Sequence, residues 1–116
     1  MSNVTLSLLV LRSPDIERAR SFYSTLGLQF ESHRHASGPM HLSASLHGGG
    51  VLEIYPAPNG VKSQGIRLGF RVESVDLAVA ALVREGGSIE SAVHDSEWGR
   101  RAVVADPDGN KVELSQ

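Results

Sequence analysis

The sequence contains no cysteine, no excess of basic residues and no long hydrophobic run. The absence of cysteine excludes disulfides, thiolate metal ligands and cysteine nucleophiles, and it suits a reducing cytosol. A formal net charge of -2 gives no basic surface for nucleic acid. The apolar run at residues 6–11 is too short to cross a bilayer and has no basic segment before it. We therefore expect a cytoplasmic protein that binds neither nucleic acid nor a membrane.

The hydrophobic content is sufficient for one compact domain, because 116 residues of which 41% are apolar can bury a core of their own. Residues 4–11 are rich in Leu and Val and predict a strand. Ser13 can cap the helix that follows, with Pro14 in its first turn. Apolar residues then recur at helical spacing as far as Gly27, which suits the end of a helix: Ile16, Ala19, Phe22, Tyr23 and Leu26.

Three further strands are predicted in the first half, at residues 27–35, 41–47 and 51–55. In the second of these strands, apolar residues alternate with His41, Ser43, Ser45 and His47. This alternation places a polar face opposite an apolar one. Residues 57–65 are rich in Pro, Gly and Asn and predict a linker between a module of about residues 1–56 and one of about 66–116.

The second half repeats the order of the first: a strand at 66–72, a helix at 74–85, and strands at 89–93, 101–105 and 111–114. The segment Ser13-Pro14-Asp15-Ile16 is echoed by Ser74-Val75-Asp76-Leu77, and Leu52-Glu53-Ile54 by Val112-Glu113-Leu114. The sequence thus predicts an α+β fold in which two βαβββ modules form a curved mixed sheet with a concave cleft. One module alone would leave its apolar sheet face poorly covered, so two must pair, within the chain or across a dimer.

Two motifs stand at matching places in this duplicated order: the helix segment SPDIERARSFY from Ser13 to Tyr23, and the terminal run DPDGNKVEL from Asp106 to Leu114. Each is weak alone, since Pro-Asp-Gly-Asn is also a good hairpin turn. Their order and spacing over almost the whole chain resemble the vicinal-oxygen-chelate superfamily, the glyoxalase, bleomycin-resistance and extradiol-dioxygenase group. The resemblance implies a single domain with a cleft for a small organic molecule.

In metal-using members of this superfamily, four side chains hold one divalent ion, and the resemblance assigns these positions to Leu8, Glu53, Arg67 and Glu113. Both carboxylates alternate with apolar neighbours and should face the cleft. Leu8 cannot bind a cation, and the permanent charge of Arg67 opposes one. We expect Arg67 to form an ion pair with one or both glutamates in place of a metal. No cofactor is therefore predicted, and a divalent metal ion is the alternative.

Histidine could restore a metal site in one way only. His41 and His47 lie about 20 Å apart at the rise of a strand, so just one of them could join Glu53 and Glu113. His33 and His35 are expected to be a solvated pair near a hairpin end.

Two aromatic residues have both a binding and a structural interpretation. Tyr55 shares the face of Glu53 and could offer a wall and a hydroxyl to a ligand, or could simply keep its hydroxyl in water. Trp98 lies in Glu97-Trp98-Gly99-Arg100-Arg101, which resembles the loop that borders the ligand groove in bleomycin-resistance-like members, or it could cover one end of the fold. The polar face of residues 41–47 fits a wet pocket or solvent. Arg71 and Arg101 are candidate rim cations or solvated arginines.

Three functions remain open. The first is a metal-free dimer that binds a small organic molecule through His41, Tyr55, Trp98 and the cluster of Glu53, Arg67 and Glu113. The second is an enzyme of the lyase, isomerase or dioxygenase type, in which Glu53 or Glu113 is a metal ligand or a base and Arg67 could stabilise an enolate. The third is a protein that acts only through its dimer surface. The sequence does not identify the ligand.

Overall fold

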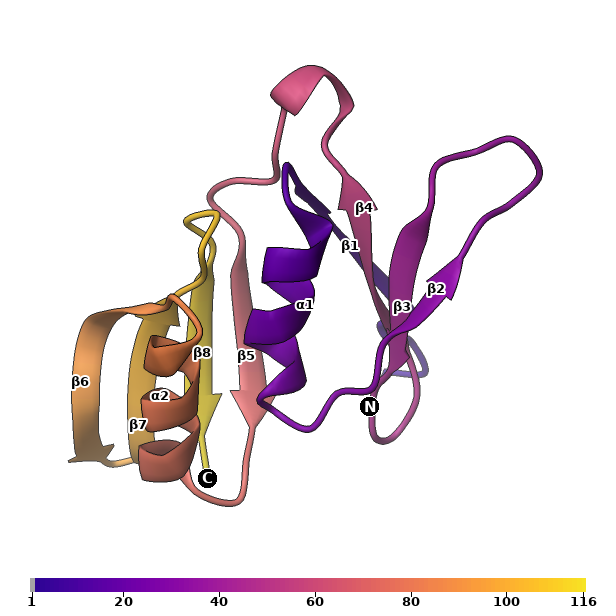
Figure 1. The fold of residues 1–116 in the computed structure, drawn as a ribbon. Coiled ribbons are helices and arrows are strands. Elements are labelled where there is room, and N and C mark those ends of the chain that lie inside the picture. Colours follow the sequence, from indigo (N-terminus) through magenta and orange to yellow (C-terminus); the bar gives the residue numbers. More distant parts are fainter. Residues whose placement is uncertain (1) are drawn as a thin grey trace.

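The chain folds as two consecutive modules of the same topology (Figure 1). The computed structural model describes residues 2–116. The first module contains β1 (Leu8–Ser13), α1 (Ile16–Ser24), β2 (Glu31–His33), β3 (His41–Ser45) and β4 (Val51–Pro56). A short 3₁₀ turn, η1 (Pro58–Gly60), lies between the modules. The second module contains β5 (Arg67–Arg71), α2 (Val75–Arg84), β6 (Ser88–Ser96), β7 (Gly99–Ala105) and β8 (Lys111–Ser115).

Each module forms its own four-stranded mixed sheet, in the order β1-β4-β3-β2 and β5-β8-β7-β6. The first strand of each module runs parallel to the last, and the other pairs are antiparallel. The register repeats as well, because Val10 lies opposite Glu53 just as Gly69 lies opposite Glu113. The predicted duplication of a βαβββ unit is therefore confirmed, in the form of two sheets.

The helix caps differ in part from the sequence prediction. Asp15 is the N-cap of α1 and accepts a hydrogen bond from the Arg18 backbone, so the prediction of Ser13 as the cap was wrong. The Ser13 hydroxyl instead accepts the backbone N–H of Asp15, which fixes the turn before the helix. Ser74 caps α2. The equivalent caps are thus Asp15 and Ser74, a carboxylate and a hydroxyl that each accept the backbone N–H three residues further on.

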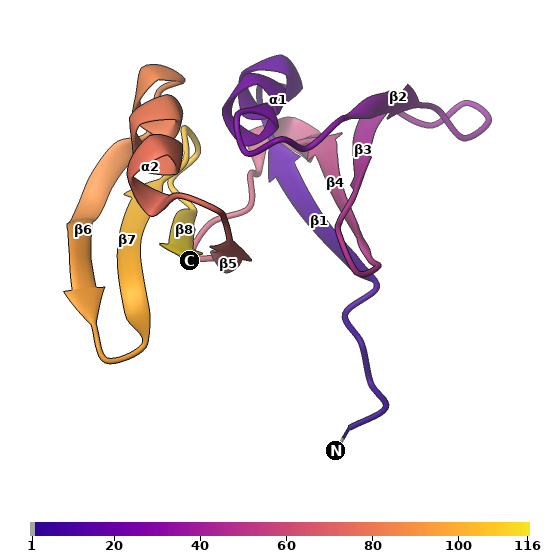
Figure 2. The ribbon, with the colours of Figure 1, turned by 90° about the horizontal axis from the view of Figure 1, so that it is seen from below.

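Two predicted strands are shorter in the structure. The strand expected at residues 4–11 begins only at Leu8, and the one expected at 27–35 is reduced to Glu31–His33. All three residues of this edge strand are exposed, so it has no buried face that would favour a longer pairing with β3. Both helices lie on the same side of the two sheets (Figure 2). Among residues 2–116, no helix has the length and apolar character needed to cross a bilayer.

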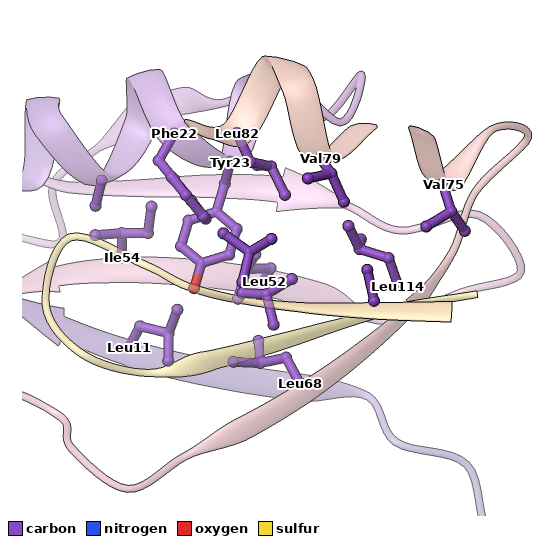
Figure 3. Close-up of a cluster of buried hydrophobic side chains, with 14 of the residues drawn as sticks. Leu11, Phe22, Tyr23, Leu52, Ile54, Leu68, Val75, Val79, Leu82 and Leu114 are labelled. Atoms are coloured by element: carbon purple, nitrogen blue, oxygen red, sulfur yellow. The ribbon is translucent and has the colours of Figure 1, made fainter. Parts of the chain in front are cut away.

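One hydrophobic core joins the two modules (Figure 3). The helix-facing strand residues Leu52, Ile54 and Leu114 are almost fully buried, as are Phe22 and Tyr23 of α1. Burial of each large apolar side chain contributes roughly 1.5–3 kcal/mol. The same alternation that buries these residues turns their neighbours to the opposite surface of each sheet, which we call the outer face.

Candidate functional site

The outer face of the second sheet carries a hollow of about 390 Å³. Of residues 2–116, those that line it all belong to the second module: Arg67, Glu90, Ser91, His94, Ser96, Trp98, Arg101, Val103, Lys111 and Glu113. Strand alternation explains its floor, since Val112 and Leu114 are buried in the core whereas Lys111 and Glu113 face the other way.

Glu113 is held by two arginines. Its Oε1 accepts hydrogen bonds from Arg67 Nε at 3.2 Å and from the terminal Nη2 at 2.6 Å. Its Oε2 accepts from Nη2 of Arg101 on the neighbouring strand β7. The hydrogen bonds from Arg67, with the charge of Arg101 as a further cause, hold the pKa of Glu113 below its ordinary value. Arg67 was expected to pair with one or both glutamates: it pairs with Glu113, alongside Arg101, and forms no ion pair with Glu53 among residues 2–116.

Trp98 lies at the turn between β6 and β7 and lines the same hollow, with 72% of its surface exposed. An indole this exposed does not cover the end of the fold, and its contact with a ligand stays a prediction. His94 and Lys111 also line the hollow, although the sequence interpretation did not select them. The signal for Lys111 was available, because it stands two residues before Glu113 on the same strand and therefore shares its face. His94 pairs with Arg101 across β6 and β7, a register that no sequence pattern revealed.

The first module has a different cluster around Glu53. Its Oε2 lies 3.6 Å from Nε2 of His41. The His41 ring stacks on the Tyr55 ring, with centroids 4.2 Å apart and planes at 6°. The His35 ring stacks on the His41 ring, with centroids 5.1 Å apart and planes at 29°. The guanidinium of Arg12 lies 5.3 Å from the centre of the Tyr55 ring. An Arg, a Tyr and histidine rings thus form a column beside the carboxylate.

His41 is 1% exposed, so the interpretation of its strand as the floor of a wet pocket fails at this residue. Its Nε2 is buried and has no hydrogen-bond partner among residues 2–116. His33 and His35 are exposed, as expected, and the ring centre of His33 lies 6.0 Å from that of His41. The sequence could not show this cluster, since it is formed by the pairing of β2 with β3 and by the loop between them.

Glu53 and Glu113 occupy equivalent positions but have separate partners. Glu113 contacts Arg67 and Arg101, and Glu53 lies beside His41. By register, His41 and Arg101 are themselves equivalent, each standing on the strand next to its glutamate and two residues from the position directly opposite it. Each glutamate thus has a nitrogen-bearing side chain at the same place in its module.

Leu8 and Arg67 both line a mainly apolar cavity of about 230 Å³ between β1 and β5. Leu8 and Arg67, the equivalent positions of the two first strands, therefore border the same cavity in the folded molecule. Their chemistry does not fit a divalent ion: Leu8 has no donor atom, and Arg67 places a fixed positive charge on Glu113. Among residues 2–116, no three His, Asp or Glu side chains are arranged to hold a metal ion. The donor set thus disagrees with the metal centre that the resemblance implies.

The model of the glyoxalase/bleomycin resistance protein/dioxygenase superfamily matches residues 5–114. The chain belongs to this superfamily. An uncharacterized protein of Mycolicibacterium smegmatis (strain ATCC 700084 / mc(2)155) is 31% identical over 113 residues, covering 95% of this chain and 91% of that protein. Uncharacterized protein YwkD of Bacillus subtilis (strain 168) is 34% identical over 111 residues, covering 86% and 87%.

Among solved structures of the superfamily fold, TnmS3, an antibiotic binding protein from Streptomyces sp. CB03234, is similar over 100% of this chain and 98% of its own, with a TM-score of 0.69 and 25% identity. The resemblance seen in the helix segment and the terminal run is thereby confirmed as superfamily membership, and the fold expected from it is the fold observed.

Proposed function

We propose that this superfamily member is a metal-free protein that binds a small organic molecule and works as a homodimer. The observation that carries the proposal is the engagement of both Glu113 oxygens by Arg67 and Arg101. A metal ion at this place would have to displace three charge-assisted hydrogen bonds and approach two guanidinium groups. The two arginines therefore neutralise the Glu113 carboxylate, as a metal ion does in metal-using members of the superfamily.

Small-molecule binding fits the shape and lining of the second module. A hollow of about 390 Å³ lies within the range of ligand pockets, and its lining combines an exposed indole with charged side chains. TnmS3, which shares this fold, is an antibiotic binding protein. For this chain we propose only the general role of binding an organic molecule, and not the ligand of TnmS3.

A second copy of the chain would complete the cleft. The hollow is open, whereas ligand pockets usually bury most of a ligand's surface, so an opposing wall is needed. The strands β1 and β5 are edge strands, and exposed apolar side chains extend along the segment before and at the start of β1: Val4, Leu6 and Leu8. A dimer that places the first module of one chain opposite the second module of its partner would cover these groups.

Elemental analysis of the untagged protein tests the metal-free part, and light scattering tests the dimer. We expect well below 0.1 equivalent of Zn, Ni, Mn or Fe per chain, roughly the level of adventitious metal, and twice the monomer mass. Protein produced in medium supplemented with each metal is the control for limited supply. About one equivalent of any of these metals per chain, retained through gel filtration, would sink the proposal.

A proton-transfer enzyme of the glyoxalase type is the second candidate, favoured by the placement of Glu53 beside the unpartnered Nε2 of His41. A carboxylate next to an imidazole can move a proton at a carbon adjacent to a carbonyl. The measurement is deuterium uptake by dihydroxyacetone in D₂O, followed by NMR, with Glu53→Gln as the comparison. Uptake no faster than in buffer would count against this candidate.

A further inference from the structure

The hollow of the second module carries an unbalanced positive charge. Arg67, Arg101 and Lys111 line it, against the carboxylates of Glu90 and Glu113. Glu113 is shared by two guanidinium groups, and one carboxylate can neutralise only one of them. Lys111 forms no ion pair within the part of the chain that the structure describes. The floor of the hollow therefore has one positive charge more than its acids offset.

The two arginines also keep unused hydrogen-bond donors. A guanidinium has five N–H groups. Arg101 gives Glu113 a bond from Nη2 only, and Arg67 uses Nε and Nη2. The other N–H groups of both side chains have no acceptor among the described residues. Forked N–H pairs of this kind match the two oxygens of a carboxylate.

Partial burial makes this charge effective. The side chains of Arg101 and Glu113 are 28% and 24% exposed, whereas that of Arg67 is 56% exposed. Water and salt therefore screen Arg101 less than they screen Arg67. An anion that enters the hollow meets a charge already fixed in place by the hydrogen bonds to Glu113, and little side-chain ordering is needed on binding.

Trp98 supplies a second recognition element. The indole is a large exposed apolar group on the border of a hollow that is otherwise mostly polar. A flat aromatic ring on the ligand would stack on it and cover the exposed surface. A ring resting on Trp98 can direct an attached acid group towards the arginines that line the same hollow.

The geometry points to a planar aromatic compound with a single carboxylate as the ligand of this protein. This inference rests on the proposed small-molecule-binding function and narrows its ligand class. One uncompensated charge matches a monoanion, whereas a phosphate dianion would leave an excess of negative charge. Stacking on Trp98 supplies affinity, and Arg67 with Arg101 selects the charge.

Trp98 is the only tryptophan in the chain, so its indole N–H gives a single reporter signal in a ¹⁵N NMR spectrum. Four probes share one ring and differ in charge: 2-naphthoate, 2-naphthamide, 2-naphthylmethylamine and 2-naphthyl phosphate. Titration of the native protein should shift the Trp98 signal with 2-naphthoate, with a Kd at least about tenfold lower than for each of the other three, as expected for a charge-assisted contact.

The matched variants are Arg67→Gln and Arg101→Gln. Each removes one charge from the hollow while the other arginine still holds Glu113. Each should reduce the preference of naphthoate over naphthamide to about threefold or less, since the excess charge is gone. Arg71→Gln removes the same charge from the same strand and face but lies outside the hollow, and it should keep the tenfold preference.

Equal binding of naphthoate and naphthamide, or tighter binding of the amine or phosphate, would overturn the ligand class and leave the binding function standing. A naphthoate preference that survives in both variants would overturn the assigned residues. If none of the four probes binds, the aromatic carboxylate is excluded. The proposed function is judged separately, because one equivalent of metal per chain removes it whatever the probes do.

Discussion

Tyr23 of α1 donates a 2.6 Å hydrogen bond to Asp106, which follows β7 in the other module. Asp106 also accepts backbone N–H groups of Asp108 and Asn110 and the side-chain amide of Asn110. One buried carboxylate therefore organises the turn of the second module and fastens it to the helix of the first. The Phe-Tyr pair and the Asp-Pro-Asp-Gly-Asn run, two motifs that carried the resemblance, are in direct contact.

Replacement of Tyr23 by Phe removes this hydrogen bond and leaves a buried carboxylate with one partner fewer. We expect the free energy of unfolding to fall by about 1–3 kcal/mol, the usual cost of an unmet buried acceptor. Urea unfolding of both proteins at neutral pH measures it. Tyr55→Phe is the control, because no hydrogen bond involves the Tyr55 hydroxyl within residues 2–116; a loss as large in the control would contradict the specific role of Tyr23.

The same pair predicts an alkaline effect. Burial first, and then the negative charge of Asp106, raise the pKa of Tyr23 well above its ordinary value. The unfolded chain would ionise this phenol near pH 10 while the folded chain would not, so its stabilising effect is complete below pH 10 and is lost as pH rises further. The stability difference between the native protein and Tyr23→Phe should therefore shrink above pH 10, and a difference that stays constant to pH 11 would refute it.

Gly87, between α2 and β6, is required for close packing. A Cβ there would lie 2.7 Å from Cγ1 of Val104 and 2.8 Å from Cε1 of Phe22, both in the shared core. We expect Gly87→Ala to cost about 1–3 kcal/mol through overpacking, measured by urea unfolding. Gly69→Ala on β5 is the control, because its Cβ would meet no atom within 4 Å. A cost no larger than that of Gly69→Ala would show that the close contacts at Gly87 are not what matters.

Much of the fold was predictable because it follows from local patterns. Alternation in Leu52-Glu53-Ile54 and Val112-Glu113-Leu114 placed both carboxylates on outer faces, which the burial of the flanking residues bears out. The resemblance placed Arg67 beside the two carboxylates, and its fixed charge predicted an ion pair with one or both of them; the structure shows the pair with Glu113. The first inference needed only strand periodicity, whereas the second also needed the site positions that the resemblance implied.

The remaining features depend on contacts between distant segments. The column of Tyr55, His41 and His35 forms through strand pairing and a loop, neither of which has a sequence period. The cap at Asp15 was missed because Ser13 is also a good capping residue, and only the turn geometry decides between them. The link from Tyr23 to Asp106 spans 83 positions and depends on how the modules pack.

Acid should weaken the native protein through Glu113. Its pKa is lowered chiefly by the hydrogen bonds from Arg67, so the unfolded chain takes up a proton before the folded one does. The stabilising effect is therefore complete above the ordinary glutamate pKa of about 4.3 and is lost as pH falls through the lowered value. Glu113→Gln should be less stable by about 1 kcal/mol at pH 6, with the difference shrinking towards pH 3.

Urea unfolding at intervals from pH 3 to pH 6 measures this effect. Glu90→Gln is the control, because Glu90 lines the same hollow and takes part in no ion pair among residues 2–116. We expect it to change stability by no more than about 0.5 kcal/mol across the range. If the stability difference between the native protein and Glu113→Gln grows as the pH falls, its pH dependence is opposite to the one expected, and a stabilising ion pair at this carboxylate is ruled out.

Restoring imidazole at the two first-strand positions should create a metal site. In the double variant Leu8→His and Arg67→His, two neutral nitrogen donors join the carboxylates of Glu53 and Glu113, within one chain or across a dimer, and the charge that repels a cation is gone. Because zinc binds the folded state, the Tm should rise with zinc concentration, by roughly 2.7 kcal/mol of stabilisation at a hundredfold excess over Kd. Leu8→His with Arg71→His carries the same number of new imidazoles but leaves Arg67 on Glu113, and its Tm should not respond. If the two double variants respond alike, Arg67 is not what keeps metal from Glu113, and the basis for regarding the protein as metal-free is lost.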